Sequence, residues 1–179
     1  MKRHKRLYFH FSETLKYQLE GLKVSESLGI PQYIAASLRN IGAVYSRIGD
    51  LDNAMAYDLQ ALKLIEDGEP TITLARTYSA IGNNYLNRKE YQTALFDYQK
   101  FVETSRPTDN KNDEAQALMS IGDVFREQEQ PETARPYYIQ ALELFQQTSD
   151  PNDAHGIPGT REIGACLIAS NSFRVFLAG

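Results

Sequence analysis

The side chains with the greatest capacity for catalysis or metal binding are three histidines and one cysteine. His4, His10, His155 and Cys166 are scattered along the chain, and none has a second histidine or cysteine at the spacing of a metal site. Cys166 also lacks a neighbouring base that could activate its thiol. The sequence contains no glycine-rich phosphate loop and no nucleophile elbow. It therefore predicts neither an enzyme nor a metal or cofactor site.

One polar segment has the outline of a calcium-binding loop. Residues 109–113 read Asp-Asn-Lys-Asn-Asp, so four of these five side chains carry an oxygen atom. Lys111 occupies a position where a ligand is required, and Glu114 replaces the glycine that such a loop needs for its sharp turn. We interpret the segment as a linker whose last residues cap the following helix.

The composition is that of a folded protein with a small acidic excess. The 179 residues are 42% hydrophobic, which is enough for one domain or one array of repeats. Basic residues number 19 and acidic residues 23, and the net charge of −4 argues against a nucleic-acid partner. No apolar stretch approaches the roughly 20 residues that cross a membrane, and the basic start is not followed by an export signal. With a single cysteine, we expect a cytoplasmic protein.

The elements that position the polar side chains follow from an internal repeat of forty residues. An Ile-Gly pair returns three times with an aromatic residue three positions later: Ile41-Gly42 with Tyr45, Ile81-Gly82 with Tyr85, and Ile121-Gly122 with Phe125. An alanine keeps the same phase at Ala54, Ala94 and Ala134. Such a period is typical of arrays in which each repeat is one supersecondary unit.

Each repeat is predicted to contain two helices. In the first repeat, apolar residues recur every three or four positions from Ile34 to Ile48, which is the spacing of one helix face. Gly49 is a typical C-terminal residue for that helix, and Asp50 is a typical N-cap for the next. Glycine inside a helix costs about 1 kcal/mol relative to alanine, so its return in every first helix needs a reason. We expect close helix crossing, with Ala54, Ala94 and Ala134 filling the gap.

This spacing resembles that of tetratricopeptide repeats over about residues 12 to 150. The pattern of a large residue, an aliphatic-glycine pair, an aromatic residue and two small residues is seen in Leu38-x-x-Ile41-Gly42-x-x-Tyr45 with Ala54 and Ala61. The resemblance implies an all-α superhelix of stacked antiparallel helix pairs. Its forty-residue period is similar to that of a subclass found in bacterial regulatory proteins and animal polarity scaffolds. Asp58, where an aromatic residue is usual, and Phe101, where a small one is usual, imply looser packing in the middle unit.

The repeat divides the chain into five parts. We predict an N-terminal capping helix or partial repeat over residues 1–30, three repeat units over residues 31–70, 71–110 and 111–150, and an irregular C-terminal segment with a capping helix over residues 151–179. Tyr17 and Leu22 match Tyr57 and Leu62, so the first part corresponds to the second helix of a unit. Ile163-Gly164 resembles the repeat signature two residues out of phase, and an apolar stretch follows. We favour a helix that caps the stack; a segment that forms a homodimer or continues into a further domain is the alternative.

The inner wall of such a superhelix is lined by the first helices, and repeat proteins bind partners there. Residues on these helices that are not needed for packing are the candidate binding residues: Arg39, Ala43, Arg47, Arg76, Ser79, Asn83, Asn87, Met119, Asp123 and Arg126. Arginine suits carboxylates and backbone carbonyls, and asparagine can both donate to and accept from an extended peptide. The set predicts a peptide site with an acidic segment as ligand. The alternative is a solvated polar helix face without a partner.

Two functions are consistent with this organisation. The first is a non-enzymatic scaffold that binds a peptide or protein segment in the concave groove. The second is the sensory or regulatory arm of a bacterial signalling protein or system that controls an output enzyme. The second function is suggested by the irregular ends of the chain and by the resemblance to bacterial regulatory arrays. A longer reading frame that contains a cyclase or kinase domain would support it.

Overall fold

The computed structural model describes residues 2–148, with side chains from Phe11 onward. These residues form helices and no strand, which confirms the prediction of an all-α protein. The elements are α1 (Lys2–Leu28), α2 (Pro31–Arg47), α3 (Leu51–Ile65), α4 (Ile72–Asn87), α5 (Tyr91–Ser105), the 3-10 helix η1 (Arg106–Thr108), α6 (Lys111–Glu127) and α7 (Pro131–Thr148). Within residues 2–148, none of the helices has the length and apolar character of a membrane span.

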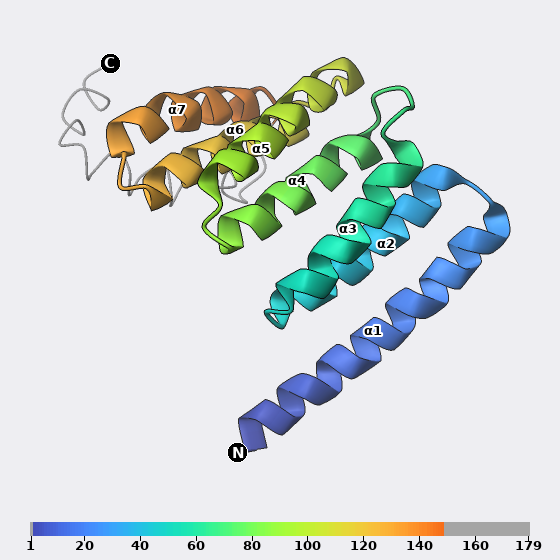
Figure 1. Cartoon of the computed structure of the whole chain (residues 1–179). Coiled ribbons are helices and arrows are strands. Elements are labelled where there is room, and N and C mark those ends of the chain that lie inside the picture. The colour runs from blue at the N-terminus through green and yellow to red at the C-terminus, as the bar shows by residue number, and fades with distance from the viewer. Residues whose placement is uncertain (1, 149–179) are drawn as a thin grey trace.

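The helices are arranged as a stack of antiparallel pairs. Figure 1 shows the pairs α2–α3, α4–α5 and α6–α7 in chain order, with α1 beside α2 at one end and α7 at the other. Contacts are most extensive within a pair and next most extensive between the second helix of one pair and the first helix of the next. The first helices α2, α4 and α6 also contact one another in sequence. They form a continuous wall, so the predicted superhelix is confirmed.

The helix ends explain why the chain reverses at regular intervals. Gly49 has a φ of 81°, and the side chain of Asp50 accepts a hydrogen bond from the backbone N–H of Asn53 at 3.1 Å. Both residues thus act as the sequence predicts. Asn110 caps α6 by accepting from the N–H of Asp113 at 3.1 Å. The predicted linker is therefore shorter than expected, because residues 111–113, which were to complete it, form the first turn of α6. Left-handed backbone at these turns lets a short linker satisfy the last helical carbonyls.

The glycines inside the first helices permit close crossing, but alanine does not fill the gap. A Cβ on Gly82 would lie 2.7 Å from a ring carbon of Tyr98, and one on Gly122 would lie 2.8 Å from a ring carbon of Tyr138. At Gly42 the nearest atom is Oδ1 of Asp58, at 2.6 Å. The prediction that Ala54, Ala94 and Ala134 fill the gap is therefore wrong: the side chain one turn later in the second helix does so.

The core is continuous through the second and third pairs. Tyr98, Tyr138 and Phe101 are among its largest fully buried side chains, and a smaller apolar cluster joins α2, α3 and the start of α4. Tyr78 packs against both clusters. Phe101 is only 1% exposed, so the expectation of looser packing in the middle unit is wrong. The bulky residue is accommodated as part of the core.

Candidate functional site

The structure places the predicted binding residues on α2, α4 and α6 with different degrees of exposure. Five are exposed: Ala43, Arg47, Arg76, Asn83 and Asn87. Four are partly buried: Arg39, Ser79, Asp123 and Arg126. Met119 is 7% exposed and belongs to the hydrophobic core, so it does not line a surface and leaves the candidate set. Its apolar thioether side chain has no polar group that must stay in water.

Arg76 is anchored by an acidic residue of the next repeat. Its Nε donates to both carboxylate oxygens of Asp113, at 3.1 and 3.0 Å. Asp113 lies in the first turn of α6, and the Nδ2 of Asn110 also donates to its Oδ2 at 3.0 Å. Because Asp113 engages only Nε, the terminal nitrogens of the half-exposed guanidinium stay available as donors. Sequence reasoning missed Asp113, which the sequence indicates only as part of the linker and its cap.

Arg39 lies close to Arg76 and has an unsatisfied donor. The Nε of Arg39 is buried and has no hydrogen-bond partner. Burial lowers the pKa of Arg39, and the neighbouring charge of Arg76 lowers it further, while Asp58 and Asp113 act in the opposite direction. Arginine nevertheless stays charged at neutral pH. Two guanidinium groups therefore share one part of the inner wall, and only Arg76 has an acidic partner in hydrogen-bond contact.

Asp58 is a buried carboxyl group behind this part of the wall. It is 2% exposed, its Oδ2 accepts from the Nδ2 of Asn84 at 2.7 Å, and its buried Oδ1 has no partner. Burial raises the pKa of Asp58 to about 7, against the opposing effects of Asn84 and Arg39. The sequence indicates Asp58 only as a departure from the repeat pattern. An acidic residue at a position that is buried in every repeat was the available signal.

The other two repeats have tyrosine in place of Asp58. The hydroxyl group of Tyr98 donates to Oδ1 of Asn83 at 2.7 Å, and that of Tyr138 donates to Oδ1 of Asp123 at 2.8 Å. Two predicted binding residues are therefore also structural acceptors. The first repeat has Ala43 at the corresponding position, which offers no side-chain acceptor. Asn84, the amide that donates to Asp58, is also particular to the second repeat. Valine holds the corresponding positions in the first and third repeats, Val44 and Val124.

Removal of these hydroxyl groups is expected to affect the two repeats unequally. Tyr138→Phe should lower the free energy of unfolding by about 1.5–3 kcal/mol because its acceptor is a charged carboxylate. Tyr98→Phe should cost about 1 kcal/mol because its acceptor is a neutral amide. Urea denaturation of both variants at pH 7 measures the difference. An equal or reversed order would mean that the two hydroxyl groups do not act through these bonds.

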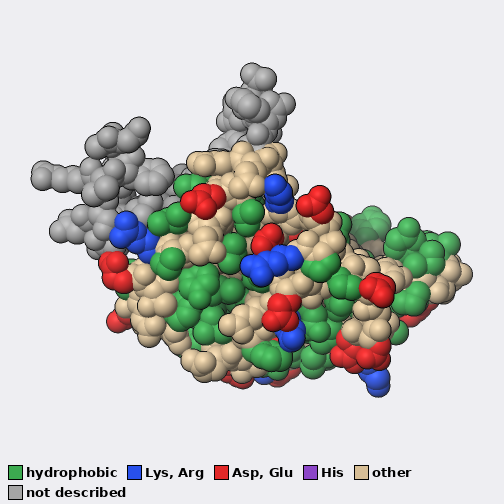
Figure 2. Space-filling view, turned by 90° about the horizontal axis from the view of Figure 1, so that it is seen from above, with side chains coloured by type: hydrophobic (Ala, Val, Ile, Leu, Met, Phe, Trp, Pro, Cys, Tyr) green, Lys and Arg blue, Asp and Glu red, His purple; other side chains and the backbone are tan. Residues whose placement is uncertain are grey.

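Arg126 is largely neutralised within its own helix. One terminal nitrogen lies 2.9 Å from Oδ1 of Asp123, and the other lies 3.6 Å from Oε1 of Glu127. The third repeat therefore contributes little net charge to the wall. Figure 2 shows acidic, basic and hydrophobic side chains interspersed over the face seen there, without a large area of one sign. Within the candidate set, unneutralised positive charge is concentrated at Arg39, Arg47 and the open side of Arg76.

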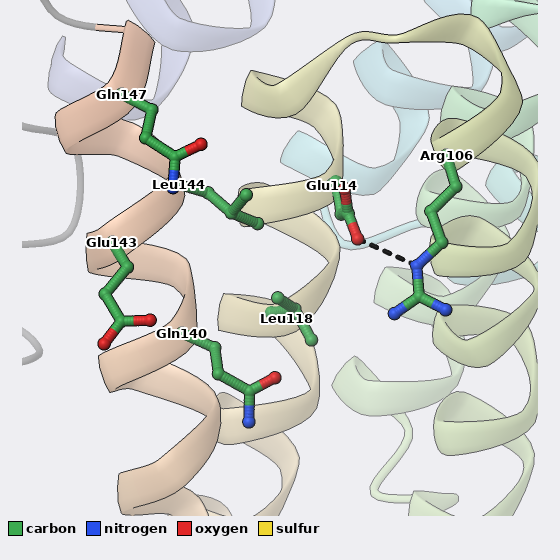
Figure 3. A pocket seen from close by; sticks show the side chains of 7 residues that line it. All are labelled: Arg106, Glu114, Leu118, Gln140, Glu143, Leu144 and Gln147. Carbon is green, nitrogen blue, oxygen red and sulfur yellow. Dashed lines mark hydrogen bonds and ion pairs between the residues drawn. The ribbon is translucent and has the colours of Figure 1, made fainter.

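A pocket of about 200 Å³ lies away from these residues (Figure 3). The ion pair from Nε of Arg106 to Oε1 of Glu114, at 2.8 Å, borders it, and α7 contributes the opposite side. Its volume is below the roughly 300 Å³ at which small-molecule sites begin. None of the candidate binding residues lines it. Within the part of the chain that the structure describes, no three His, Cys, Asp or Glu side chains are grouped as metal ligands would be.

A stack of antiparallel helix pairs with a polar wall of first helices defines an α-helical repeat protein. Two models of the tetratricopeptide repeat match the chain, one over residues 34–67 and the other over residues 73–148. The chain belongs to the tetratricopeptide repeat family. No curated protein sequence gives a significant match.

Solved structures share the fold at low sequence identity. BtubC (BKLC) from P. vanneervenii is 17% identical with a TM-score of 0.77, and the alignment covers 95% of this chain and 70% of that one. The apo form of RapI is 20% identical with a TM-score of 0.72, over 97% of this chain and 49% of that one. Aspartyl phosphate phosphatase F from Bacillus subtilis is 22% identical with a TM-score of 0.64, over 78% and 39%. The chain thus spans about half the length of RapI and less of the phosphatase.

Proposed function

We propose that the chain is a non-enzymatic, cytoplasmic scaffold that binds a peptide or protein segment along the wall formed by α2, α4 and α6. The family and the fold support a protein partner, because repeat arrays of this kind present extended concave surfaces to other polypeptides. The observation that carries the proposal is the pair Arg39 and Arg76, two neighbouring guanidinium groups of which only Arg76 has an acidic hydrogen-bond partner. A bound segment would supply a carboxylate to this pair.

The chemistry of this pair favours an acidic ligand. A carboxylate is the best acceptor for two neighbouring guanidinium groups because its bonds to them are charge-assisted and can be bidentate. Asp113 provides such a carboxylate to Arg76 inside the protein itself. We therefore propose that an acidic side chain of the partner lies between Arg39 and Arg76.

The rest of the segment would run from this pair along α4. Asn87 is exposed, and Asn83 is exposed with its Oδ1 held by Tyr98, which leaves its Nδ2 group to donate. Amide groups in this position suit the carbonyl groups of an extended main chain. Arg47 is an exposed third cation for a longer acidic segment. Asp123 and Arg126 pair with each other and are proposed as the end of the site.

The double variant Arg39→Glu/Arg76→Glu tests the proposal. It should weaken binding of the partner segment by at least about tenfold, because two attractive charges become repulsive. The partner is first captured from native lysate and its segment is then titrated against purified protein by calorimetry. Circular dichroism should show unchanged helix content.

The matched control is Lys23→Glu/Lys63→Glu, which makes the same change of charge at two exposed positions outside the wall. It should bind the segment as the wild type does. If the arginine variant binds as well as the control, the groove is not the binding site. If both lose binding equally, the effect comes from net charge and not from the two arginines.

A second candidate function is supported by the similarity to RapI and to aspartyl phosphate phosphatase F. The similarity concerns the fold, and both proteins are longer than this chain. In this alternative, binding of a segment changes the curvature of the stack and thereby controls an output enzyme. Small-angle scattering with and without the captured segment would test it, since a rigid scaffold should keep its curve. Homodimerisation through the apolar C-terminal segment also stays a proposal, because residues 149–179 lie outside the described part of the chain.

A further inference from the structure

Helix α1 has two different faces, and only one of them is packed. On the packed face, Leu22 joins the apolar cluster of α2 and α3, and Oγ of Ser25 lies 2.7 Å from Oγ of Ser37. The adjacent face is exposed and carries residues at alternating spacings of three and four: Thr14, Tyr17, Gly21, Val24 and Leu28. We refer to these five residues as the α1 stripe. Its three large members are 65%, 61% and 57% exposed, and this spacing is that of a seam between two helices.

The repeat period shows what the α1 stripe is built to contact. Thr14 and Gly21 correspond to Ala54 and Ala61, which are fully buried in the first complete pair. Tyr17 corresponds to Tyr57, whose ring stacks on Tyr45 of the first helix with centroids 5.5 Å apart. In the first complete pair these three positions therefore face a first helix, whereas on α1 they face solvent. Leu64, which corresponds to Val24, is itself 45% exposed, so the comparison supports the stripe from Thr14 to Gly21.

The neighbouring helix α2 also has an exposed residue where a preceding first helix would lie. Tyr33 is 55% exposed. The corresponding residue of the third repeat is Asp113, which is 7% exposed and pairs with Arg76 on the preceding first helix. A helix placed along the α1 stripe would thus have a second contact on α2. Both observations point to one docked helix.

The chain itself contains a further sequence of the required kind, outside the residues that the structure describes. The three signatures Ile41-Gly42, Ile81-Gly82 and Ile121-Gly122 belong to α2, α4 and α6, which pair with α3, α5 and α7. A fourth pair, Ile163-Gly164, lies in the segment beyond Thr148, and α1 is the one second-type helix in residues 2–148 without a first helix. We propose that the segment around Ile163-Gly164 of one copy docks on the α1 stripe of a second copy, so that the chains associate head to tail.

Head-to-tail contact is favoured over a symmetric contact between two α1 helices. Glu13 and Glu20 border the α1 stripe on its solvent side. An antiparallel crossing centred on Gly21 would bring Glu20 of both copies together, and like charges at such a seam are unfavourable. The segment around Ile163-Gly164 has an arginine at 161 beside the glutamate at 162, so it adds no net charge there. Helices α1 and α7 lie at opposite ends of the stack (Figure 1). A segment that follows α7 in the chain is therefore better placed to contact α1 of another copy than α1 of its own chain.

Complementation between two variants of the 179-residue chain tests this proposal. Tyr17→Glu damages the docking surface, and Gly164→Glu damages the docked segment. The wild-type chain should show a mass that rises with concentration beyond that of a dimer, because a head-to-tail contact leaves one free end of each kind. Each variant alone should associate at least about tenfold more weakly, since a charge enters the centre of the contact. Sedimentation equilibrium measures both.

An equimolar mixture of the two variants is the decisive sample. Gly164→Glu keeps an intact α1 stripe and Tyr17→Glu keeps an intact segment, so the mixture should form a one-to-one dimer and nothing larger. Phe96→Glu, at a 58% exposed position on α5, is the control and should associate as the wild type does. Circular dichroism of every variant establishes that it is folded. A monomeric wild type, a mixture that does not dimerise, or a Tyr17→Glu variant that associates normally would each overturn the proposal.

Discussion

The stability of this protein is expected to fall as the pH rises from about 4 to about 7, and Asp58→Asn is expected to remove most of that fall. Burial raises the pKa of Asp58 to about 7 in the folded chain, from its ordinary value of 3.8. Between these two values the folded state binds the proton that the unfolded state has lost, so the free energy of unfolding decreases with increasing pH. The full effect amounts to about 4 kcal/mol, on the scale of about 1.36 kcal/mol for each pH unit.

The physical reason lies in the surroundings of the carboxyl group. Asn84 donates to one oxygen of Asp58, while the other oxygen is buried without a partner and faces Gly42. Arg39 attracts the ionised form, but the loss of hydration on burial has the larger effect on the pKa. The neutral amide that Asp58→Asn introduces has nearly the same shape as the carboxyl group and does not ionise. The stability of this variant should therefore depend less on pH in this range.

Urea denaturation at four or five pH values between 4 and 8 measures the effect as the difference between wild type and variant. Asp97→Asn is the matched control. Burial raises the pKa of Asp97 to about 6, so that variant should remove a fall in stability that is smaller in total and ends about one pH unit earlier. Parallel stability curves for wild type and Asp58→Asn would show that Asp58 is ionised in the folded protein throughout.

Gly82→Ala is expected to lower the free energy of unfolding by roughly 1–3 kcal/mol, the usual cost of overpacking. The new Cβ would lie 2.7 and 2.8 Å from two ring carbons of Tyr98. The ring cannot move aside easily, because Tyr98 is fully buried and its hydroxyl group is bonded to Asn83. The clash therefore outweighs the gain of about 1 kcal/mol that alanine brings to a helix interior.

The matched control is Gly21→Ala in α1, where nothing lies within 4 Å of an added Cβ. At protein concentrations too low for association through the α1 stripe, that variant should be more stable than the wild type by up to about 1 kcal/mol, since only helix propensity then changes. Thermal and urea unfolding of both variants give the comparison. Equal stability of Gly82→Ala and wild type would mean that the helices can separate at the crossing without loss.

The local features of this fold could be predicted from the sequence because they depend on neighbours in the chain. The Ile-Gly pairs indicate the first helices, and Gly49 and Asp50 indicate a turn and a cap whose bond spans three residues. The error about Ala54, Ala94 and Ala134 arose because periodicity shows which face of a helix is buried. It does not show which turn of the partner helix lies opposite a given glycine.

The candidate site was predicted less completely because its contacts join different repeats. Arg76 and Asp113 are 37 residues apart, and Asp58 and Asn84 are 26 apart, so neither pair follows from a helical spacing. The repeat pattern places Met119 on the wall because Arg39 and Ser79 hold its position in the other repeats. An apolar side chain at the same position turns into the core instead. Which residues of different repeats lie close together could therefore be learned only from the three-dimensional structure.

The bond between Asp58 and Asn84 has a consequence for how such an array can be rebuilt. Asp58 belongs to the first pair and Asn84 to the second, whereas valine holds the position of Asn84 in the first and third. If the first unit were duplicated in tandem, its buried carboxyl group would meet Val44 of the copy and lose its amide donor. These units are therefore not interchangeable. A first unit moved elsewhere in the array keeps this hydrogen bond only if the unit after it has asparagine at the position of Asn84.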